Sequence, residues 1–494
     1  MSRPDVTMPE RRLAREQLDP RASAVLQQEL PGLAVALDEE AMRDKLQKSL
    51  FGAASRFRIE RCNPGQALYT GGDAASLRYE MELTDLESGQ PHERLVTAQV
   101  FRDGNACRQY ADQVEGVAAL LAGHPAAESL ASAVALFDAL NLVVHVFPVD
   151  AELPVLVQAT NPEAVTTLLA ETLADIWEEC FTPRECRVEL AHYGRKHRCT
   201  LRYVLSGHAA DGTDAQRVIY AKLTADGAGA RTAPLIVELH EQLGGSGINI
   251  PDVLAYRAAE QMLLLPAIPG KPRVARLLKS RLAGAEAGGD LTLETAIEAC
   301  GRVAAAIHNA RTSTRQRRTL DDELAWLRDS ARAVGRVSPQ LGQQLEHWTD
   351  EAARAAAASD SLPLACCHGD FTYTQLVFDG QQPGLVDFDT ICLAEPALDL
   401  GQFLAYQRLA VLKDQRSDAP LAAGEVEELC GRFLESYSAA RGNRLGDRAH
   451  VIRRAAVYEI LMLLRLAIHS WQKLKVSRLE HALALVEERV RCLQ

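Results

Sequence analysis

The sequence predicts an α+β protein whose strands are concentrated in the first half of the chain and whose helices are concentrated in the second. Short apolar runs rich in Val, Leu and Tyr recur in the first half, with the length typical of strands. In the second half most apolar residues recur at helical spacing. Two short apolar runs interrupt the helical half, and each leads into acidic residues.

The composition is that of an ordinary soluble globular protein, with 494 residues, 47% hydrophobic and 24% charged. This length predicts more than one domain. The net charge of −12 argues against general nucleic-acid binding. No apolar run is long enough to span a bilayer, and the first residues lack a signal-peptide core. We therefore expect a cytoplasmic protein that binds neither membrane nor nucleic acid; the sequence gives no indication of oligomeric state.

Changes in pattern divide the chain into five predicted parts. Residues 1–50 are expected to form a helical extension and residues 161–186 a helical connector. Residues 51–160 and residues 187–270 each contain a series of strand-like runs. Residues 271–494 are expected to form a helical lobe that carries the acidic residues.

The two series of strands resemble each other in order and in detail. Leu77-Arg78-Tyr79 in the first series parallels Leu201-Arg202-Tyr203 in the second. Further along, Val144–Pro148 parallels Leu263–Pro266. Internal repeats of this kind decide the architecture of a chain.

At one position the two series differ in charge, because Gln99 stands where the second series has Lys222. A neutral amide cannot supply the cation that phosphates need. We therefore predict that residues 51–160 are a degenerate copy of the second series, used as a cap or an interface. The alternative is chance similarity between two amphipathic meanders.

The acidic residues of the helical half form a pattern suited to phosphoryl transfer. Asp370 closes a His-Gly-Asp turn, Gln375 follows five residues later, and an Asp-Phe-Asp triplet contains Asp387 and Asp389. A kinase needs one carboxylate to accept the proton of the substrate hydroxyl, and an amide oxygen and a second carboxylate to hold Mg²⁺. We assign Asp370 as the base, and Gln375 and Asp387 as magnesium ligands.

Asp389 has three interpretations that the sequence leaves open: a magnesium ligand, a strand-end cap, or a contact to a cationic substrate. For the whole motif, the alternative to a kinase site is an ordinary hairpin with polar ends. The joint presence of both acidic turns, each preceded by an apolar run, favours the kinase.

A lysine that holds nucleotide phosphates is expected on a strand upstream of these residues. Lys222 lies within the apolar run Arg217–Leu223 and suits this role. An exposed lysine on an edge strand is the alternative.

These motifs resemble the superfamily of aminoglycoside phosphotransferases, choline kinases and maltokinases. Its pattern is His-Gly-Asp, an Asn five residues after that Asp, an Asp-Phe pair and Asp-Pro-Ala-x-Asp-Leu. This chain departs from the pattern at Gln375, where Asn is usual, and at Glu395, where Asp is usual. The resemblance implies a protein-kinase-like fold with an antiparallel-sheet N-lobe and a helical C-lobe, and ATP and Mg²⁺ as cofactors.

The resemblance also assigns structural roles. It implies that Asp399 is a buried carboxylate that holds the catalytic loop in place. His368 and His308 are expected to be packing residues.

For the nucleotide, the resemblance indicates partners on both sides of Lys222. Either Glu238 or Glu241, on a helix expected over Pro234–Leu243, is a candidate to pair with the lysine; spacing favours Glu238, and a solvated charge is an equal alternative. Backbone groups of a hinge strand are expected to bind adenine. In that strand Pro266 offers only its carbonyl, whereas Ile268 retains an N–H.

The glycine-rich loop of protein kinases is missing, because Gly194 is the only glycine between the first two strands of the second series. Arg195, Lys196 and His197 follow it and form either a phosphate contact or a solvated turn. The solvated turn is the simpler interpretation.

Together these features predict an ATP-dependent phosphotransferase that acts on a hydroxyl of a small molecule. The resemblance implies that this acceptor is a sugar, an aminosugar or an amino alcohol. The alternative is a catalytically inactive, kinase-like scaffold or regulatory protein, which the Gln375 substitution and the extra lobe would suit.

Overall fold

The computed structural model describes residues 18–52, 55–69, 72–177, 181–194, 198–285, 289–413, 423–444 and 446–493.

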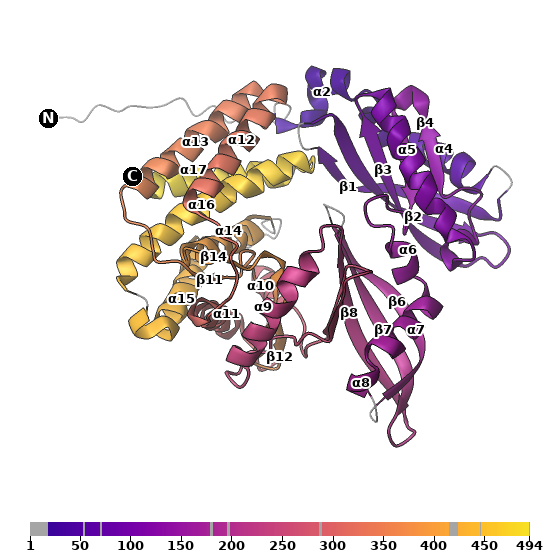
Figure 1. Ribbon diagram of the computed structural model, residues 1–494. Helices are drawn as coiled ribbons and strands as arrows, with labels where there is room; N and C mark the ends of the chain where they lie inside the picture. Colours follow the sequence, from indigo (N-terminus) through magenta and orange to yellow (C-terminus); the bar gives the residue numbers. More distant parts are fainter. Residues whose placement is uncertain are drawn as a thin grey trace.

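Two five-stranded antiparallel sheets occupy the first half of the chain (Figure 1). The first sheet has the strand order β1-β2-β3-β5-β4 and the second has the order β6-β7-β8-β10-β9. The strands of the first sheet are β1 (Phe57–Tyr69), β2 (Ala74–Asp85), β3 (Pro91–Phe101), β4 (Val134–Phe137) and β5 (Leu142–Val146). Those of the second are β6 (Phe181–Gly194), β7 (Arg198–Ala209), β8 (Asp214–Thr224), β9 (Ala255–Arg257) and β10 (Met262–Pro266).

The two sheets agree in their connections as well as in their strand order. After its third strand each chain segment forms a helix, which is α5 (Gly104–Ala118) in the first sheet and α9 (Ala228–Leu243) in the second. In the first sheet Ser76 pairs with Gln99, and in the second Thr200 pairs with Lys222. The register therefore puts Gln99 and Lys222 at equivalent positions.

A buried tyrosine on the second strand of each sheet forms the same kind of bond. Tyr79 and Tyr203 are both 0% exposed. The Tyr79 hydroxyl donates to the carbonyl of Ala36 at 2.5 Å, and the Tyr203 hydroxyl donates to that of Ala159 at 2.9 Å. In both cases the acceptor ends a short helix that precedes the sheet. These parallels support the predicted duplication, which stays a prediction.

The register corrects one detail of the repeat. Gln99 pairs with Val143 and Lys222 pairs with Leu263, so Val146 is the counterpart of Pro266. Pro148 therefore lies two residues beyond the position that the sequence comparison gave it. Runs of apolar residues can slide against each other in an alignment, whereas strand pairing fixes their register.

Helices account for most of the remaining chain. Before the first sheet lie α2 (Ala24–Glu29), α3 (Gly32–Ala36) and α4 (Glu39–Leu46); between the sheets lie α6 (Leu156–Ala159), α7 (Pro162–Thr172) and α8 (Ala174–Trp177). The helical lobe contains α10 (Val274–Leu282), α11 (Leu293–Asn309), α12 (Leu320–Val337), α13 (Pro339–Ala357), α14 (Ala397–Lys413), α15 (Ala423–Arg441), α16 (Arg448–Gln472) and α17 (Val476–Leu493). Helix α9 begins six residues before Pro234, where the sequence predicted its start, because a proline within a helix was read as a start signal.

Two short hairpin-like pairs of strands lie within the helical lobe. β11 (Ala365–Cys367) pairs with β14 (Cys392–Ala394), and β12 (Leu376–Asp379) pairs with β13 (Gln382–Leu385). The predicted α+β fold with an antiparallel-sheet N-lobe and a helical C-lobe is confirmed. The predicted domain boundaries stay predictions.

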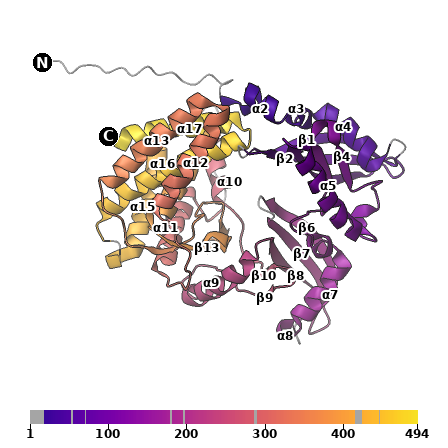
Figure 2. The same cartoon turned by 45° about the horizontal axis from the view of Figure 1, so that its top comes forward.

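The first sheet also touches the far end of the helical lobe, as the view in Figure 2 shows. The ring of Tyr69, at the end of β1, lies 5.8 Å from the ring of Trp471 near the end of α16. One buried apolar cluster contains residues of β1, β2, α9, α16 and the catalytic loop. The two sheets and the helical lobe therefore surround a central space. Among the described residues, no helix has the length and apolarity needed to cross a membrane.

Candidate functional site

The turn that contains Asp370 is held by a buried carboxylate. Strand β11 leads into His368, Gly369 and Asp370, and Asp399 at the start of α14 lies beneath them with 0% exposure. Its two oxygens accept the backbone N–H groups of His368 at 2.7 Å and Gly369 at 2.8 Å. Its Oδ2 also lies 3.1 Å from Nε2 of His308. Asp399 thus has the role of loop anchor that was expected from the resemblance.

Glycine is required in the middle of this turn. Gly369 has φ +78°, and a Cβ placed there would lie 2.2 Å from the carbonyl oxygen of Thr390. The side chain of the next residue, Asp370, accepts from Gln375 and Gln402. His368 is fully buried and its Nε2 bonds to the carbonyl of Val386, so it joins the turn to the end of β13.

Asp387 leaves the end of β13 with an unusual backbone. Its φ of 70° and ψ of 61° lie in the left-handed region, which Asp tolerates better than most residues. Such conformations cluster at functional sites because the surrounding structure must hold them. Asp389 follows in the next turn, and Asp387 and Asp389 both reach the same cation from the second sheet.

That cation is Lys222 of β8, whose ammonium lies 2.5 Å from Oδ1 of Asp387 and 2.7 Å from Oδ1 of Asp389. The lysine side chain is only 15% exposed. Although burial opposes its charge, the two carboxylates raise the pKa of Lys222. Burial likewise opposes the charge of Asp387, but Lys222 lowers the pKa of that carboxyl. The ion pair therefore keeps both groups ionised.

Gln375 lies between Asp370, the predicted base, and Asp387, a predicted magnesium ligand. Its Nε2 is 3.2 Å from Oδ2 of Asp370 and 3.4 Å from Oδ2 of Asp387. Rotation of the amide by half a turn would present its oxygen to the same place, since the two ends of an amide are nearly isosteric. The extra methylene of Gln therefore does not prevent the amide from reaching this position.

The donor set fits a divalent cation. Asp387 and Asp389 already converge on one positive charge, and the Gln375 amide adjoins Asp387. Carboxylate and amide oxygens are the ligands that Mg²⁺ prefers. The Lys222 ammonium lies between Asp387 and Asp389 and so marks a place where these two carboxylates hold a positive charge.

Asp370 itself is in a different electrostatic state. Burial raises the pKa of Asp370, and the nearby negative charge of Asp387 adds to this effect. Its second partner, Gln402 of α14, donates from Nε2 to Oδ1 at 2.5 Å. Gln402 was not predicted from the sequence, although it lies three residues after Asp399 and hence on the same face of α14.

A second supporting residue that the sequence did not reveal is Arg318. Its Nη1 donates to the carbonyl of Gly369 at 2.8 Å, and its guanidinium pairs with Glu323. Glu323 also accepts from Arg465 at 2.8 Å. No motif marks these residues: Arg318 precedes α12, Glu323 lies on α12 and Arg465 on α16, and the fold alone brings them to the turn that contains Asp370.

The expected pairing of Lys222 with Glu238 does not occur in this structure. Glu238 lies on α9, and its Oε2 accepts the backbone N–H of Ser313 at 2.9 Å. The closest partners of Lys222 are instead Asp387 and Asp389 of the helical lobe. Two carboxylates attract the Lys222 ammonium more strongly than the single carboxylate of Glu238 would. No ion pair of Glu241 is recorded among the described residues.

The hinge candidates lie where β10 leaves the sheet. Pro266 pairs with Ile219 at the last position of the β8–β10 register, and the N–H of Ala267 donates to the carbonyl of Val218. Ile268 follows immediately, and its side chain is close to Gly384 of β13. The strand thus passes from the second sheet to the helical lobe at this point. The turn residues 195–197 lie outside the described residues.

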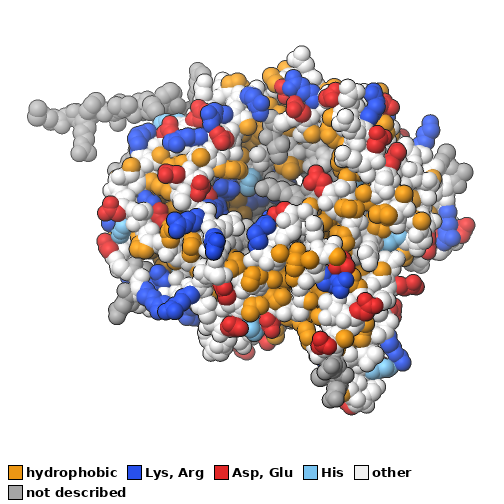
Figure 3. Space-filling model, viewed as in Figure 1, with side chains coloured by type: hydrophobic (Ala, Val, Ile, Leu, Met, Phe, Trp, Pro, Cys, Tyr) orange, Lys and Arg blue, Asp and Glu red, His pale blue; other side chains and the backbone are white. Residues whose placement is uncertain are grey.

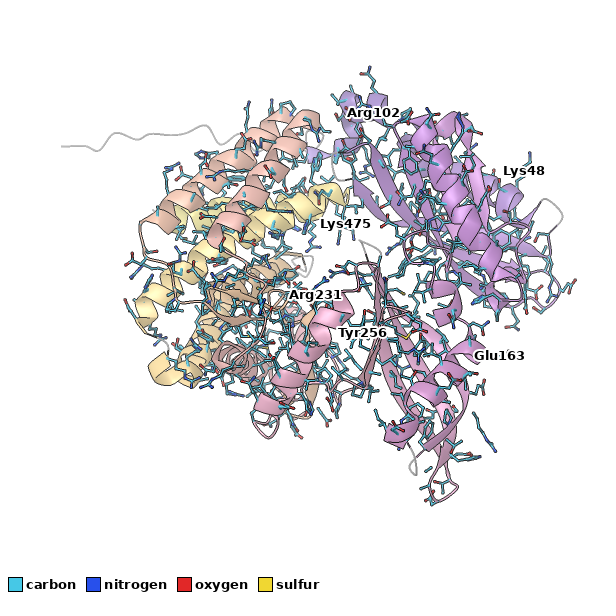
Figure 4. The ribbon with its side chains drawn as sticks, in the orientation of Figure 1. Lys48, Arg102, Glu163, Arg231, Tyr256 and Lys475 are labelled. Carbon is cyan, nitrogen blue, oxygen red and sulfur yellow. The ribbon has the colours of Figure 1, made fainter. Side chains whose placement is uncertain are left out.

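Figure 3 shows a hollow in the middle of the visible face, between the helical lobe and the two sheets, with lysine and arginine side chains around it. Figure 4 labels Lys475 just beyond the end of α16, beside this opening.

Comparison with known proteins finds one family that is similar to this region. Residues 210–425 match the model of the Phosphotransferase enzyme family. The match covers Lys222 and the turns that carry Asp370 and Asp387. No curated protein gave a significant match to the chain.

Solved structures show the same likeness. A choline/ethanolamine kinase family protein from Mesorhizobium loti is 14% identical, with TM-score 0.40, over 62% of this chain and 92% of that chain. A glucosamine kinase is 16% identical, with TM-score 0.42, over 62% of this chain and 95% of that chain. A choline kinase from Cryptosporidium parvum Iowa II is 11% identical, with TM-score 0.43, over 67% and 96%.

The family match confirms the resemblance inferred from the sequence. The matched segment is similar to phosphotransferase enzymes, and it contains the residues of the candidate site.

Proposed function

We propose that this protein transfers the γ-phosphoryl group of ATP to a hydroxyl group of a small molecule. The observation that carries the proposal is the convergence of Lys222, Asp370, Gln375 and Asp387, which come from separate segments of both lobes, on one place. Phosphoryl transfer depends mainly on positioning and charge compensation, which such an arrangement supplies.

In this proposal Asp370 accepts the proton of the acceptor hydroxyl. Its raised pKa favours this role, because a base must be able to take up a proton as the bond to phosphorus forms. Gln402 and Gln375 each hold one of its oxygens and so fix the direction of the carboxylate.

The cofactors follow from the remaining residues. Gln375 and Asp387, with Asp389 as a further candidate, would hold Mg²⁺, which neutralises phosphate charge when it is bound. Lys222 would contact the phosphates, and backbone groups at Pro266 and Ile268 would contact adenine. Glu238 stays a candidate partner of Lys222 in a nucleotide-bound conformation.

For the acceptor, we propose a hydroxylated small molecule such as a sugar, an aminosugar or an amino alcohol. Two of the similar structures, a glucosamine kinase and a choline kinase, are named after acceptors of these kinds. A cationic acceptor cannot rely on Asp389 in the present conformation, because that carboxylate is paired with Lys222.

The test is magnesium-dependent ATP turnover measured over a panel of sugars, aminosugars and amino alcohols, with Asp370→Ala as the control. We expect at least one acceptor to raise turnover, and the Asp370→Ala variant to lose about 10²-fold or more in kcat. Magnesium and a non-hydrolysable ATP analogue should also raise the melting temperature of both proteins. Failure of every acceptor, together with no melting shift, would favour the inactive scaffold.

A further inference from the structure

The first sheet contacts the second through a partly buried arginine, Arg78. The guanidinium of Arg78, on β2, donates to the carbonyl of Tyr193 and, at 2.8 Å, to the carbonyl of Gly194. Its Cζ lies 4.0 Å from the centre of the Tyr193 ring. Among the described residues no carboxylate forms an ion pair with Arg78. Both carbonyls belong to the end of β6, so the contact crosses from one sheet to the other.

Placing the Arg78 guanidinium between the two sheets costs part of its hydration free energy. Burial lowers the pKa of Arg78, since a desolvated guanidinium loses its hydration. Two carbonyls and a ring face compensate it in place of an acid. The Tyr193 side chain is itself fixed, because its hydroxyl donates to Asp150. The end of β6 is therefore held from two sides.

The same strand position in the second sheet shows what is special about Arg78. Arg202 is its counterpart, and Arg202 pairs with Glu189, which lies directly opposite on the neighbouring strand. In the first sheet the residue opposite Arg78 is Gln66, which carries no charge. The position opposite Arg78 on β1 thus holds no acid, and the guanidinium bonds to carbonyls of the second sheet.

The segment that Arg78 holds faces the proposed phosphate site. In the register of the second sheet His192 pairs with Thr200, and Thr200 pairs with Lys222, so the three residues form one row across adjacent strands. Paired residues share a face of the sheet, and two strand spacings are about 10 Å. His192 therefore lies on the same face as Lys222, at about this distance.

Contacts at the other side of the turn agree with this placement. Arg198, the first residue of β7, lies opposite Gly194, and its Nη1 is 4.0 Å from Oδ2 of Asp389. Burial and the charges of Arg78, Lys473 and Lys222 lower the pKa of His192, and Asp387 opposes them. The end of β6 and the start of β7 thus stand over the carboxylates that Lys222 bridges.

We propose that Arg78 is a positioning residue that fixes the end of β6, at Tyr193 and Gly194, beside the proposed phosphate site. The first sheet would in this way hold a strand end of the second sheet in place. This inference rests on the proposed function, since it assigns a task to this strand end only if the site binds a nucleotide. In this proposal the first sheet contributes to nucleotide binding through Arg78.

The experiment measures the binding of magnesium and a non-hydrolysable ATP analogue to the full-length protein by calorimetry, so that no acceptor is needed. We expect Arg78→Gln to weaken nucleotide binding about tenfold, with a circular dichroism spectrum like that of the wild type. Arg78→Lys keeps the charge but not the planar fork, and should fall between the two. If Arg78→Gln fails to fold, Arg78→Lys carries the test.

Arg94→Gln is the matched control. Arg94 is also in the first sheet, burial also lowers its pKa, and its side chain contacts Ser129 of the same lobe. We expect it to leave nucleotide binding within about twofold of the wild type. Once an acceptor is known, Arg78→Gln should raise the KM for ATP and leave the KM for the acceptor unchanged.

Three results would overturn the inference. They are unchanged nucleotide binding in folded Arg78→Gln or Arg78→Lys, an equal loss in Arg94→Gln, and a loss of acceptor binding instead of nucleotide binding. A wild-type protein that binds no nucleotide would overturn the proposed function as well, whereas the first three results would leave it standing.

Discussion

At the scale of single residues, the site depends on side chains that each satisfy two partners. Gln375 adjoins both Asp370 and Asp387, and Lys222 bridges Asp387 and Asp389. Replacement of one side chain therefore changes the environment of several others. Effects of single substitutions should be strongly non-additive.

Gln375→Asn tests whether the longer amide is a functional choice. Asn is the residue usual in the resembling superfamily, and it would keep the amide while withdrawing it by one methylene. We expect partial activity, with about a tenfold loss in kcat and a higher magnesium requirement, because the amide oxygen no longer reaches the same position. Steady-state kinetics at varied magnesium concentration measures both. Full inactivity of Gln375→Asn beside an active wild type would contradict a simple ligand role.

The sequence revealed the residues of the catalytic turns but not their partners. Asp370, Gln375 and Asp387 were recognisable because their spacing is local and each follows an apolar run. The partner of Lys222 was not, because Lys222 and Asp387 are 165 residues apart in the sequence. The spacing of the resembling family favours Glu238, whereas the contact of the two lobes brings Asp387 and Asp389 to the lysine.

At the scale of elements, the turn formed by His368, Gly369 and Asp370 is hydrogen-bonded to α14. Asp399 is at the start of that helix and accepts two backbone N–H groups of the turn. A buried carboxylate of this kind supports the turn only while it is ionised. Burial opposes its charge, but His308 and the backbone donors lower the pKa of Asp399.

Asp399→Asn should therefore cost stability in a way that depends on pH. The amide has one oxygen for two N–H donors, so we expect a loss of about 2–4 kcal/mol in the free energy of unfolding near neutral pH. Because the folded-state pKa of Asp399 is lowered, its contribution is present above the unfolded-state pKa and is lost as the pH falls through the folded value. Urea unfolding of both proteins between pH 3 and pH 7 measures this. A constant difference between them across that range would contradict it.

The elements also show where sequence patterns were sufficient. The two series of strands were predicted because alternation and apolar runs are local, and the shared register of their sheets agrees with the proposed duplication. The start of α9 and the alignment of Pro148 were wrong, because prolines were given more weight than strand pairing and helix packing. Gln402 was missed although it lies one turn beyond Asp399.

At the scale of the whole molecule, the first sheet and the helical lobe share buried surface. Tyr69 and Trp471 are each 1% exposed, and they belong to the same apolar cluster. The first sheet is therefore packed against both of its neighbours. Arg78 and Trp471 are the two points at which these contacts are most specific.

Trp471→Ala should reveal whether the lobes unfold together. Removal of a fully buried tryptophan is expected to cost about 3–5 kcal/mol, and Trp471→Phe a smaller part of that. Because the apolar cluster is continuous, calorimetry should show one unfolding transition that moves to lower temperature. A separate early transition of the first sheet in the wild-type protein would show that the lobes are independent.

The lysine between two aspartates has a further consequence for how the ligands arrive. In this structure Lys222 acts as the counter-ion of Asp387 and Asp389, so part of their negative charge is already compensated. A metal ion alone must displace this ammonium, and a nucleotide alone must draw the lysine away from its acids. When both bind, the metal ion would take the place of the lysine at the aspartates, and the lysine would move to the phosphates. Each ligand should therefore favour the binding of the other.

Lys222→Met separates these effects by their opposite signs. Without the internal counter-ion, the two aspartates should bind Mg²⁺ in the absence of nucleotide about tenfold more tightly than the wild type does. The same variant should bind the ATP analogue more weakly, because the phosphates lose a cation. Calorimetric titration with Mg²⁺ alone and then with the analogue measures both. If Mg²⁺ bound equally to the two proteins, the resting lysine would not be the ion that the metal replaces.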